Sequence, residues 1–131
     1  MDGDTFFPCP SSPNCVSSMT EESSHFIEPI RYPNISAYNA KSTLLEVLNN
    51  EEDCKIIKKE ERYIHAEFKS KVFRFIDDVE FYFPINEKLI HVKSASRLGY
   101  YDFEKNKGRI KQIAKIFNKK ILLLKKNGTK E

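Results

Sequence analysis

Glycines, long apolar runs and an export signal are scarce or missing in this sequence of 131 residues. The four glycines form no glycine-rich loop of the kind that cradles phosphate groups. The longest apolar run near the C-terminus, residues 121–124, is far shorter than the roughly 20 residues that a transmembrane helix needs. The first residues are acidic and lack the positive and apolar regions of a signal peptide. We therefore expect a cytoplasmic chain with no transmembrane segment.

Cysteine is present in an odd number, and without an export signal this argues against a disulfide framework. Cys9 and Cys15 lie in a turn rich in proline, serine and asparagine. A zinc site would need Cys54 or a histidine in addition. A redox pair would need a thiolate of lowered pKa, and no basic residue or helix N-terminus adjoins either cysteine in the sequence. We interpret the two as packed thiols, predict no metal site, and leave metal binding and redox activity open.

Charge is unevenly distributed along the chain, although its net value is only +3. From residue 102 onward ten lysines and arginines stand against three acids, a balance of +7, which leaves −4 for residues 1–101. The basic end could contact an anionic membrane surface or nucleic acid. The alternative is the solvated face of an amphipathic helix.

Proline divides the chain into an arm and a domain. Residues 1–35 hold five of the six prolines, which remove hydrogen-bond donors and fix φ. This segment is therefore predicted to be an extended arm. Its apolar residues are expected to pack against the domain. Residues 36–126 form the predicted domain and residues 127–131 a tail. A hydrophobic content of 40%, with ten phenylalanines and six tyrosines, is enough for a core.

The sequence of the domain predicts two helices with four strands between them. Ser36 is a plausible N-cap for a helix that ends at Asn49–Asn50, and Asp102 or Asn106 could begin the last helix. Short spacers between the β-rich runs indicate hairpins; the runs are 54–59, 63–69, 78–83 and 89–97. The predicted fold is α+β, with a four-stranded antiparallel sheet, two helices packed on one of its faces and the extended proline-rich arm.

Alternation along the predicted strands separates an apolar face from a polar one. The apolar face backs onto the helices. The polar face carries His65, Glu67, Glu80, Lys93 and Arg97. It could be a cleft roofed by the arm, in which Arg97 binds a carboxylate or phosphate through two hydrogen bonds. The alternative is a solvated surface with cross-strand ion pairs.

Two further groupings complete the candidate site. His25, His65 and Glu67 could form a metal or acid–base group with Asp78, or be ordinary surface and core residues. Two arginines near the start of the last helix could hold an anion, or could simply pair with Asp102. The candidate ligand-binding residues are His65, Glu67, Asp78, Glu80, Ser94, Ser96, Arg97, Asp102 and Arg109, and those of the arm are Cys9, Asn14, Cys15 and His25.

Four strings of residues resemble the family called domain of unknown function 1499 (DUF1499), found in bacterial and plant proteins. They are 9–18 (CPSSPNCVSS), 62–68 (RYIHAEF), 75–81 (FIDDVEF) and 92–102 (VKSASRLGYYD), followed by Asn106 and Arg109-Ile110. The likeness runs from Cys9 to about Phe117 and implies a complete family domain with its arm. It implies no activity. The sequence departs from the family pattern at Lys93, where arginine is common, and at Phe103, where glycine is usual.

Three functions are compatible with this layout, and catalytic residues and cofactors stay unassigned. The first is a non-enzymatic binding module whose polar face and arm hold a small anionic ligand or a partner protein. The second is a small hydrolase or transferase that uses His65, Glu67 and Arg97. The third is contact with an anionic surface or with nucleic acid through the basic last helix. Glu67 and Glu80 would repel phosphates, so the polar face is not expected to bind nucleic acid.

Overall fold

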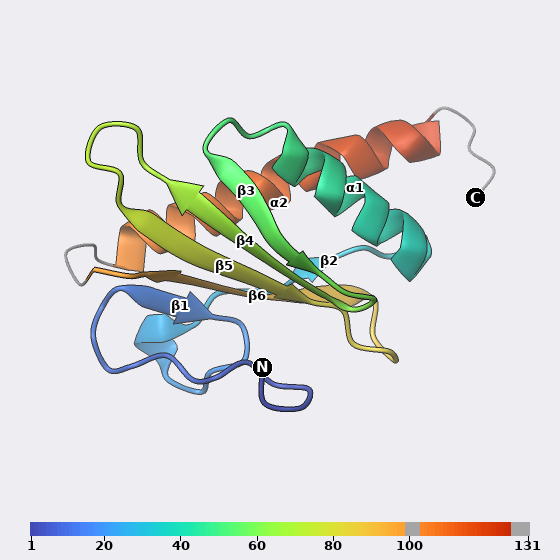
Figure 1. The fold of residues 1–131 in the computed structure, drawn as a ribbon. Helices are drawn as coiled ribbons and strands as arrows, with labels where there is room; N and C mark the ends of the chain where they lie inside the picture. Colours follow the sequence, from blue (N-terminus) through green and yellow to red (C-terminus); the bar gives the residue numbers. More distant parts are fainter. Residues whose placement is uncertain (99–102, 127–131) are drawn as a thin grey trace.

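An antiparallel sheet covered on one face by two helices makes up the computed structural model, which describes residues 1–98 and 103–126 (Figure 1). This confirms the α+β class. Within these residues, neither helix combines the length and the apolar character needed to cross a bilayer. The domain boundaries predicted at residues 35 and 126 stay predictions.

The four strands predicted from the sequence are present, within two residues of their expected bounds. They are β3 (Cys54–Lys59), β4 (Tyr63–Lys69), β5 (Ile76–Tyr82) and β6 (Leu89–Ser96). They are neighbours in this order, and each pair is antiparallel. The register between β3 and β4 shifts between Ile56 and Lys58, which marks a bulge.

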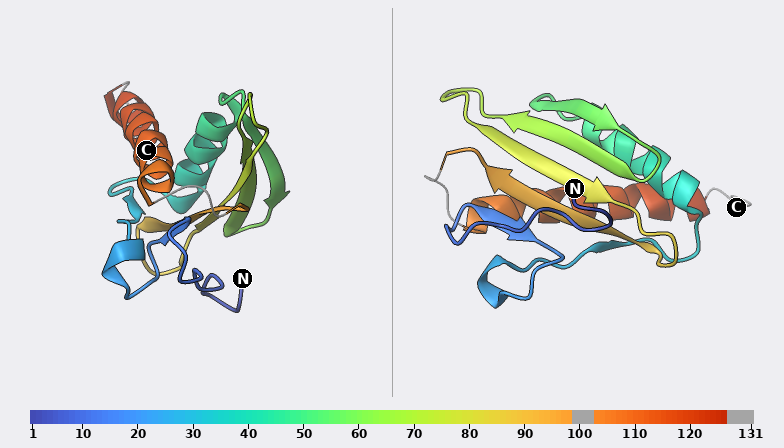
Figure 2. Two further views of the ribbon diagram at one scale, coloured as in Figure 1. Left: turned by 90° about the vertical axis from the view of Figure 1, so that its left-hand side faces the viewer. Right: turned by 60° about the horizontal axis from the view of Figure 1, so that its bottom comes forward.

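The sheet has six strands, not four, because the arm supplies two more. β1 (Cys15–Ser17) and β2 (Ile30–Arg31) both pair antiparallel with β6, and a short 3₁₀ helix η1 (Ser23–His25) lies between them. The prediction that the whole arm is extended and unpaired was wrong, because it was based on the proline content of residues 1–35. Both strand segments are free of proline, so they keep the N–H groups that pairing requires. They cover the free edge of β6, as Figure 2 shows.

The two helices begin and end for reasons visible in the sequence. In α1 (Ala37–Asn49), Ser36 is the N-cap, and its Oγ accepts a hydrogen bond of 3.0 Å from the amide of Asn39. α2 (Phe103–Lys126) starts before Asn106, which therefore lies in its first turn and is not its cap. Asp102, the other predicted cap, lies outside the described residues.

The core lies between the sheet and both helices, which are on the same side of it (Figure 2). Ile64, Ala66, Val79 and Phe81 point from the central strands into this layer and are fully buried. Helix residues at helical spacing meet them, among them Leu44, Leu48, Ile110 and Phe117. The alternation predicted from the sequence is thus confirmed, and it places every second strand side chain on the opposite face.

Candidate binding site on the polar face of the sheet

Four predicted site residues form one ion cluster on the polar face: His65, Glu67, Asp78 and Arg97. Asp78 Oδ1 lies 2.8 Å from His65 Nε2. Arg97 donates to both oxygens of Asp78, from Nε at 2.8 Å and from Nη2 at 3.0 Å, and also from Nη2 to Glu67 Oε2 at 2.6 Å. Adjacent strands bring these side chains together, since Glu67 on β4 is directly opposite Asp78 on β5.

The ion cluster is partly exposed and already balanced internally. The side chains of Glu67, Asp78 and Arg97 are 24%, 27% and 47% exposed. Burial raises the pKa of Asp78, but hydrogen bonds from Arg97 and His65 outweigh it, so the pKa lies below its ordinary value. The hydrogen bonds that Arg97 donates to Asp78 and Glu67 raise the pKa of Arg97. A small anion would therefore compete with two carboxylates for this guanidinium.

Glu80 belongs to a second group, which meets the N-terminal segment. Its carboxylate accepts a 2.6 Å hydrogen bond from the Tyr63 hydroxyl and lies 3.8 Å from Lys93 Nζ. Lys93 in turn donates to the carbonyl of Phe7 at 2.7 Å, so the segment crosses the sheet here. Burial and the bond to Glu80 raise the pKa of Tyr63, which keeps its hydroxyl a donor.

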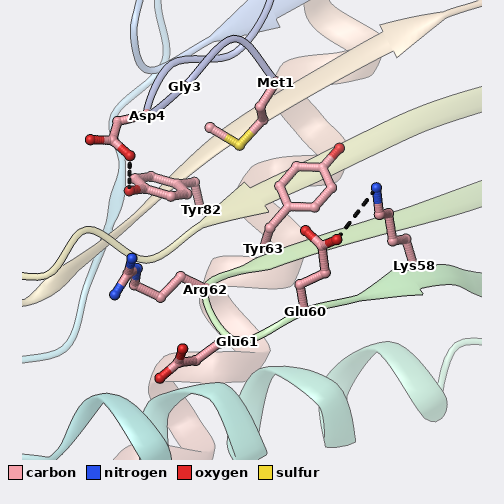
Figure 3. A pocket seen from close by; sticks show the side chains of 9 residues that line it. All are labelled: Met1, Gly3, Asp4, Lys58, Glu60, Glu61, Arg62, Tyr63 and Tyr82. Carbon is pink, nitrogen blue, oxygen red and sulfur yellow. Dashed lines mark hydrogen bonds and ion pairs between the residues drawn. The ribbon is translucent and has the colours of Figure 1, made fainter.

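A hollow of about 430 Å³ lies between the N-terminal segment and the β3–β4 turn (Figure 3). Tyr63 and Tyr82, directly opposite each other on β4 and β5, contribute their rings to it. Asp4 accepts a 2.9 Å hydrogen bond from the Tyr82 hydroxyl and so holds the segment in place. The hollow is lined by Met1, Gly3, Asp4, Lys58, Glu60, Glu61, Arg62, Tyr63 and Tyr82.

Sequence reasoning missed this hollow as a site. Alternation did place Tyr63 and Tyr82 on the polar face. No sequence signal showed that Asp4 would return to the sheet, or that Lys58 and Arg62 of the hairpin would face it. The path of the N-terminal segment depends on contacts between residues far apart in the chain, which periodicity does not report.

Ser94 and Ser96 lie on the helix-facing side of β6, away from the ion cluster. The Ser94 hydroxyl donates to Asn106 Oδ1 at 2.6 Å. The amide nitrogen of Asn106 donates to the carbonyl of Asn14 at 3.1 Å and to Ser96 Oγ at 3.3 Å, and Asn14 Nδ2 donates to the carbonyl of Ser96 at 2.8 Å. These four side chains, the polar network, fasten β1, β6 and α2 to one another.

The structure does not bring Arg97 and Arg109 to a common site. Arg109 donates to Asp77 Oδ2, which Lys105 also contacts at 2.8 Å. Asp77 is fully buried beneath α2, whereas its neighbour Asp78 lies on the polar face with Arg97. The two arginines are thus on opposite faces of the sheet, and Asp102 lies outside the described residues.

Cys9 and Cys15 form a disulfide, which corrects the argument against one. The odd number of cysteines carried no information on distance, and the intervening turn brings their Cα atoms to 5.7 Å. Cys54 remains free, and burial is the main reason that its pKa rises to about 11. His25 is beside the disulfide, with Nδ1 2.8 Å from the carbonyl of Cys15. In the described part of the chain, no three His, Cys, Asp or Glu side chains are placed to hold a metal ion.

A family model described as a protein of unknown function (DUF1499) matches residues 6–117. The chain belongs to the DUF1499 family. Three of the strings that carry the resemblance lie on β4, β5 and β6, and the fourth forms β1 beside β6, so the DUF1499 motifs are neighbours in the sheet. No curated protein matches the chain. The family description assigns no activity, so a function can be inferred only from the residues of the candidate site.

Proposed function

We propose that this DUF1499 chain is a non-enzymatic binding module that holds a small ligand on the polar face of its sheet. The observation that carries the proposal is the N-terminal segment. The Asp4–Tyr82 and Phe7–Lys93 hydrogen bonds hold it across the face. A hollow with an aromatic side remains beneath it, large enough for a molecule of several heavy atoms.

The charges of the hollow favour a ligand that carries both signs over a simple anion. Among the lining side chains there are two cations, Lys58 and Arg62, and three acids, and Lys58 Nζ already lies 3.4 Å from Glu60 Oε2. The faces of Tyr63 and Tyr82 would attract an ammonium group, which the acids would also favour. Arg62 would take a carboxylate. A zwitterion with an aromatic ring, such as a free aromatic amino acid or a peptide terminus, meets these requirements.

Three probes with one ring and different charges test the proposal. Amide chemical shifts in ¹⁵N-labelled protein would be followed during titration with phenylalanine, benzylamine and benzoate. We expect saturable shifts at residues 58–63 and 82 with phenylalanine, weaker ones with benzylamine, and the weakest with benzoate. If benzoate bound most strongly, the ligand would be a simple anion and not a zwitterion. If no probe gave saturable shifts, the hollow would not be a binding site.

The substitution Arg62→Gln tests recognition of the ligand's carboxylate separately from recognition of its ammonium group. It should weaken phenylalanine binding about tenfold or more, since a charge-assisted hydrogen bond contributes roughly 1.5–3 kcal/mol. Benzylamine binding should not change. Arg74→Gln is the matched control, because Arg74 is exposed on the β4–β5 loop and does not line the hollow. Equal losses in both variants would mean that Arg62 acts only through net charge.

The hydrolase or transferase alternative has one observation in its favour, the hydrogen bond that holds His65 against Asp78. Catalytic histidines are oriented by carboxylates in this way. Ser94 and Ser96, however, face the helices and supply no nucleophile here. Hydrolysis of p-nitrophenyl esters or phosphates that His65→Gln abolishes would favour this alternative over the binding module.

Contact between α2 and an anionic surface is also favoured by one observation. Exposed Lys111, Lys115 and Lys119 recur along one side of the helix. Leu122 and Leu123, which are 63% and 57% exposed, follow this stripe. Lysines beside exposed leucines are typical of helices that lie on anionic membranes.

A further inference from the structure

The Cys9–Cys15 disulfide borders another hollow, of about 270 Å³. The two sulfurs differ in access. Cys15 is fully buried in β1, whereas Cys9 is partly exposed and lines the hollow. The hollow is lined by Cys9, Pro10, Ser11, Thr20, Glu22, Ser24, His25 and Phe103. A reagent from solvent would thus meet the sulfur of Cys9 and not that of Cys15.

His25 is fixed in orientation within the same hollow. Its Nδ1 lies 2.8 Å from the Cys15 carbonyl, which can only accept, so Nδ1 carries a proton. The ring also meets Phe103 edge-on, with centroids 4.8 Å apart. Nε2 is therefore the acceptor nitrogen of the neutral ring. His25 and Cys9 line the same hollow, and an imidazole beside a cysteine can stabilise its thiolate.

The first residue of α2 reaches the hollow from another side. Phe103 begins this helix, whose N-terminus carries partial positive charge. Lys107 Nζ lies 5.7 Å from the centre of the Phe103 ring. Glu22 is the acid that lines the hollow and opposes these positive groups. Neither α2 nor His25 adjoins the cysteines in sequence; the fold brings both to them.

We propose that Cys9 and Cys15 are a redox-active pair that exchanges with a dithiol substrate, with Cys9 as the accessible sulfur. A thiolate of the substrate attacks Sγ of Cys9, the Cys9–Cys15 bond breaks, and Cys15 leaves with the electron pair and takes up a proton. The second substrate thiol then attacks the mixed disulfide and releases Cys9 as a thiolate. The chain gains two electrons, and the dithiol becomes a disulfide.

The polar network explains why the pair can open without loss of the fold. Asn14, next to Cys15, is held by Ser96 and Asn106 through hydrogen bonds that do not involve sulfur. β1 is also paired with β6 along its length. The turn thus keeps its anchor when the disulfide is reduced.

Alkylation of the reduced protein tests the pair. The full chain would be reduced with dithiothreitol and treated with iodoacetamide across a pH series, with site-resolved mass spectrometry. We expect the rate at Cys9 to be half-maximal below about pH 8, against about 8.5 for an ordinary thiol. Cys54, with its pKa of about 11, is the slow internal reference. A midpoint for Cys9 at or above the ordinary thiol value would overturn the proposal.

His25→Gln should move the Cys9 midpoint upward, whereas His91→Gln, at a histidine bound to Ser18 outside this hollow, should not. Equal midpoints in both variants would remove His25 from the mechanism and count against the pair. Circular dichroism of the wild-type chain before and after reduction is independent of any variant. Unchanged spectra with reversible re-oxidation are expected, and unfolding on reduction would show a purely structural disulfide.

Discussion

Asn106 shows at the residue scale how a side chain can hold three elements together. It is fully buried and bonds to Ser94, Ser96 and the Asn14 carbonyl. These contacts explain why the residue occurs in a motif of the sequence without lying at the polar face. Its role is to join α2 to β6 and to the arm.

Asn106→Ala should lower the free energy of unfolding by about 1–3 kcal/mol, because buried partners would lose their hydrogen bonds. Asn118→Ala, at an exposed position of the same helix, should change it by less than about 0.5 kcal/mol. Urea denaturation of the two variants measures the difference. Equal stabilities would mean that water replaces the lost amide.

Asp78 makes stability depend on pH. Its pKa in the folded chain lies below the ordinary value because Arg97 and His65 bond to it, in opposition to burial. The ion cluster therefore stabilises the fold above the unfolded pKa of about 3.9, and this contribution is lost as the pH falls through the folded value.

In Arg97→Gln, Tm should therefore decrease less between about pH 5 and pH 2 than it does in the wild type. In Arg74→Gln, the dependence of Tm on pH should be the same as in the wild type. Differential scanning calorimetry at several pH values measures this. A profile for Arg97→Gln that runs parallel to that of the wild type would assign the acid sensitivity to other carboxylates.

At the scale of elements, regular periodicity determined which parts of the fold could be predicted. The strands β3, β4, β5 and β6 follow from alternation and α1 from its cap Ser36, and both are local signals. β1 and β2 have three and two residues, too few to show a period, and their pairing with β6 spans most of the chain. The disulfide and the hollow beneath Asp4 escaped prediction because they depend on these long-range contacts.

The end of α2 is the element with the clearest surface prediction. We expect the protein to sediment with phosphatidylglycerol vesicles at low salt but not with phosphatidylcholine vesicles. Leu122→Ser combined with Leu123→Ser should abolish sedimentation. Val72→Ser combined with Phe73→Ser, which removes exposed apolar side chains from the β4–β5 loop, should not. No sedimentation of the wild type would leave the lysine stripe as a solvated face.

At the scale of the whole molecule, the arm is part of the sheet and not a separate extension. The amide of Ser96 donates to the carbonyl of Asn14, and the amide of Val92 donates to Ser18 Oγ, both at 2.9 Å. The edge of β6 is thereby closed by residues about eighty positions earlier in the chain.

Hydrogen exchange should report this closure. The Ser96 and Val92 amides should exchange as slowly as those in the centre of β5, whereas Lys55 and Ile57 on the bulged strand β3 should exchange faster. Nuclear magnetic resonance of the intact chain in deuterated solvent gives the rates. Rapid exchange at Ser96 and Val92 would show that β1 detaches in solution.

Asp77 and Asp78 also limit how the chain can change in length. One is enclosed with Lys105 and Arg109, and the next faces Arg97 from the opposite side. An extra residue inserted into β5 between Asp77 and Val79 would move the side chains that follow it to the opposite face of the sheet. Val79 would then face solvent, and a carboxylate would face the hydrophobic core. Insertions and deletions tolerated over evolution should therefore gather in the loop at residues 70–75, while β5 itself keeps a constant length.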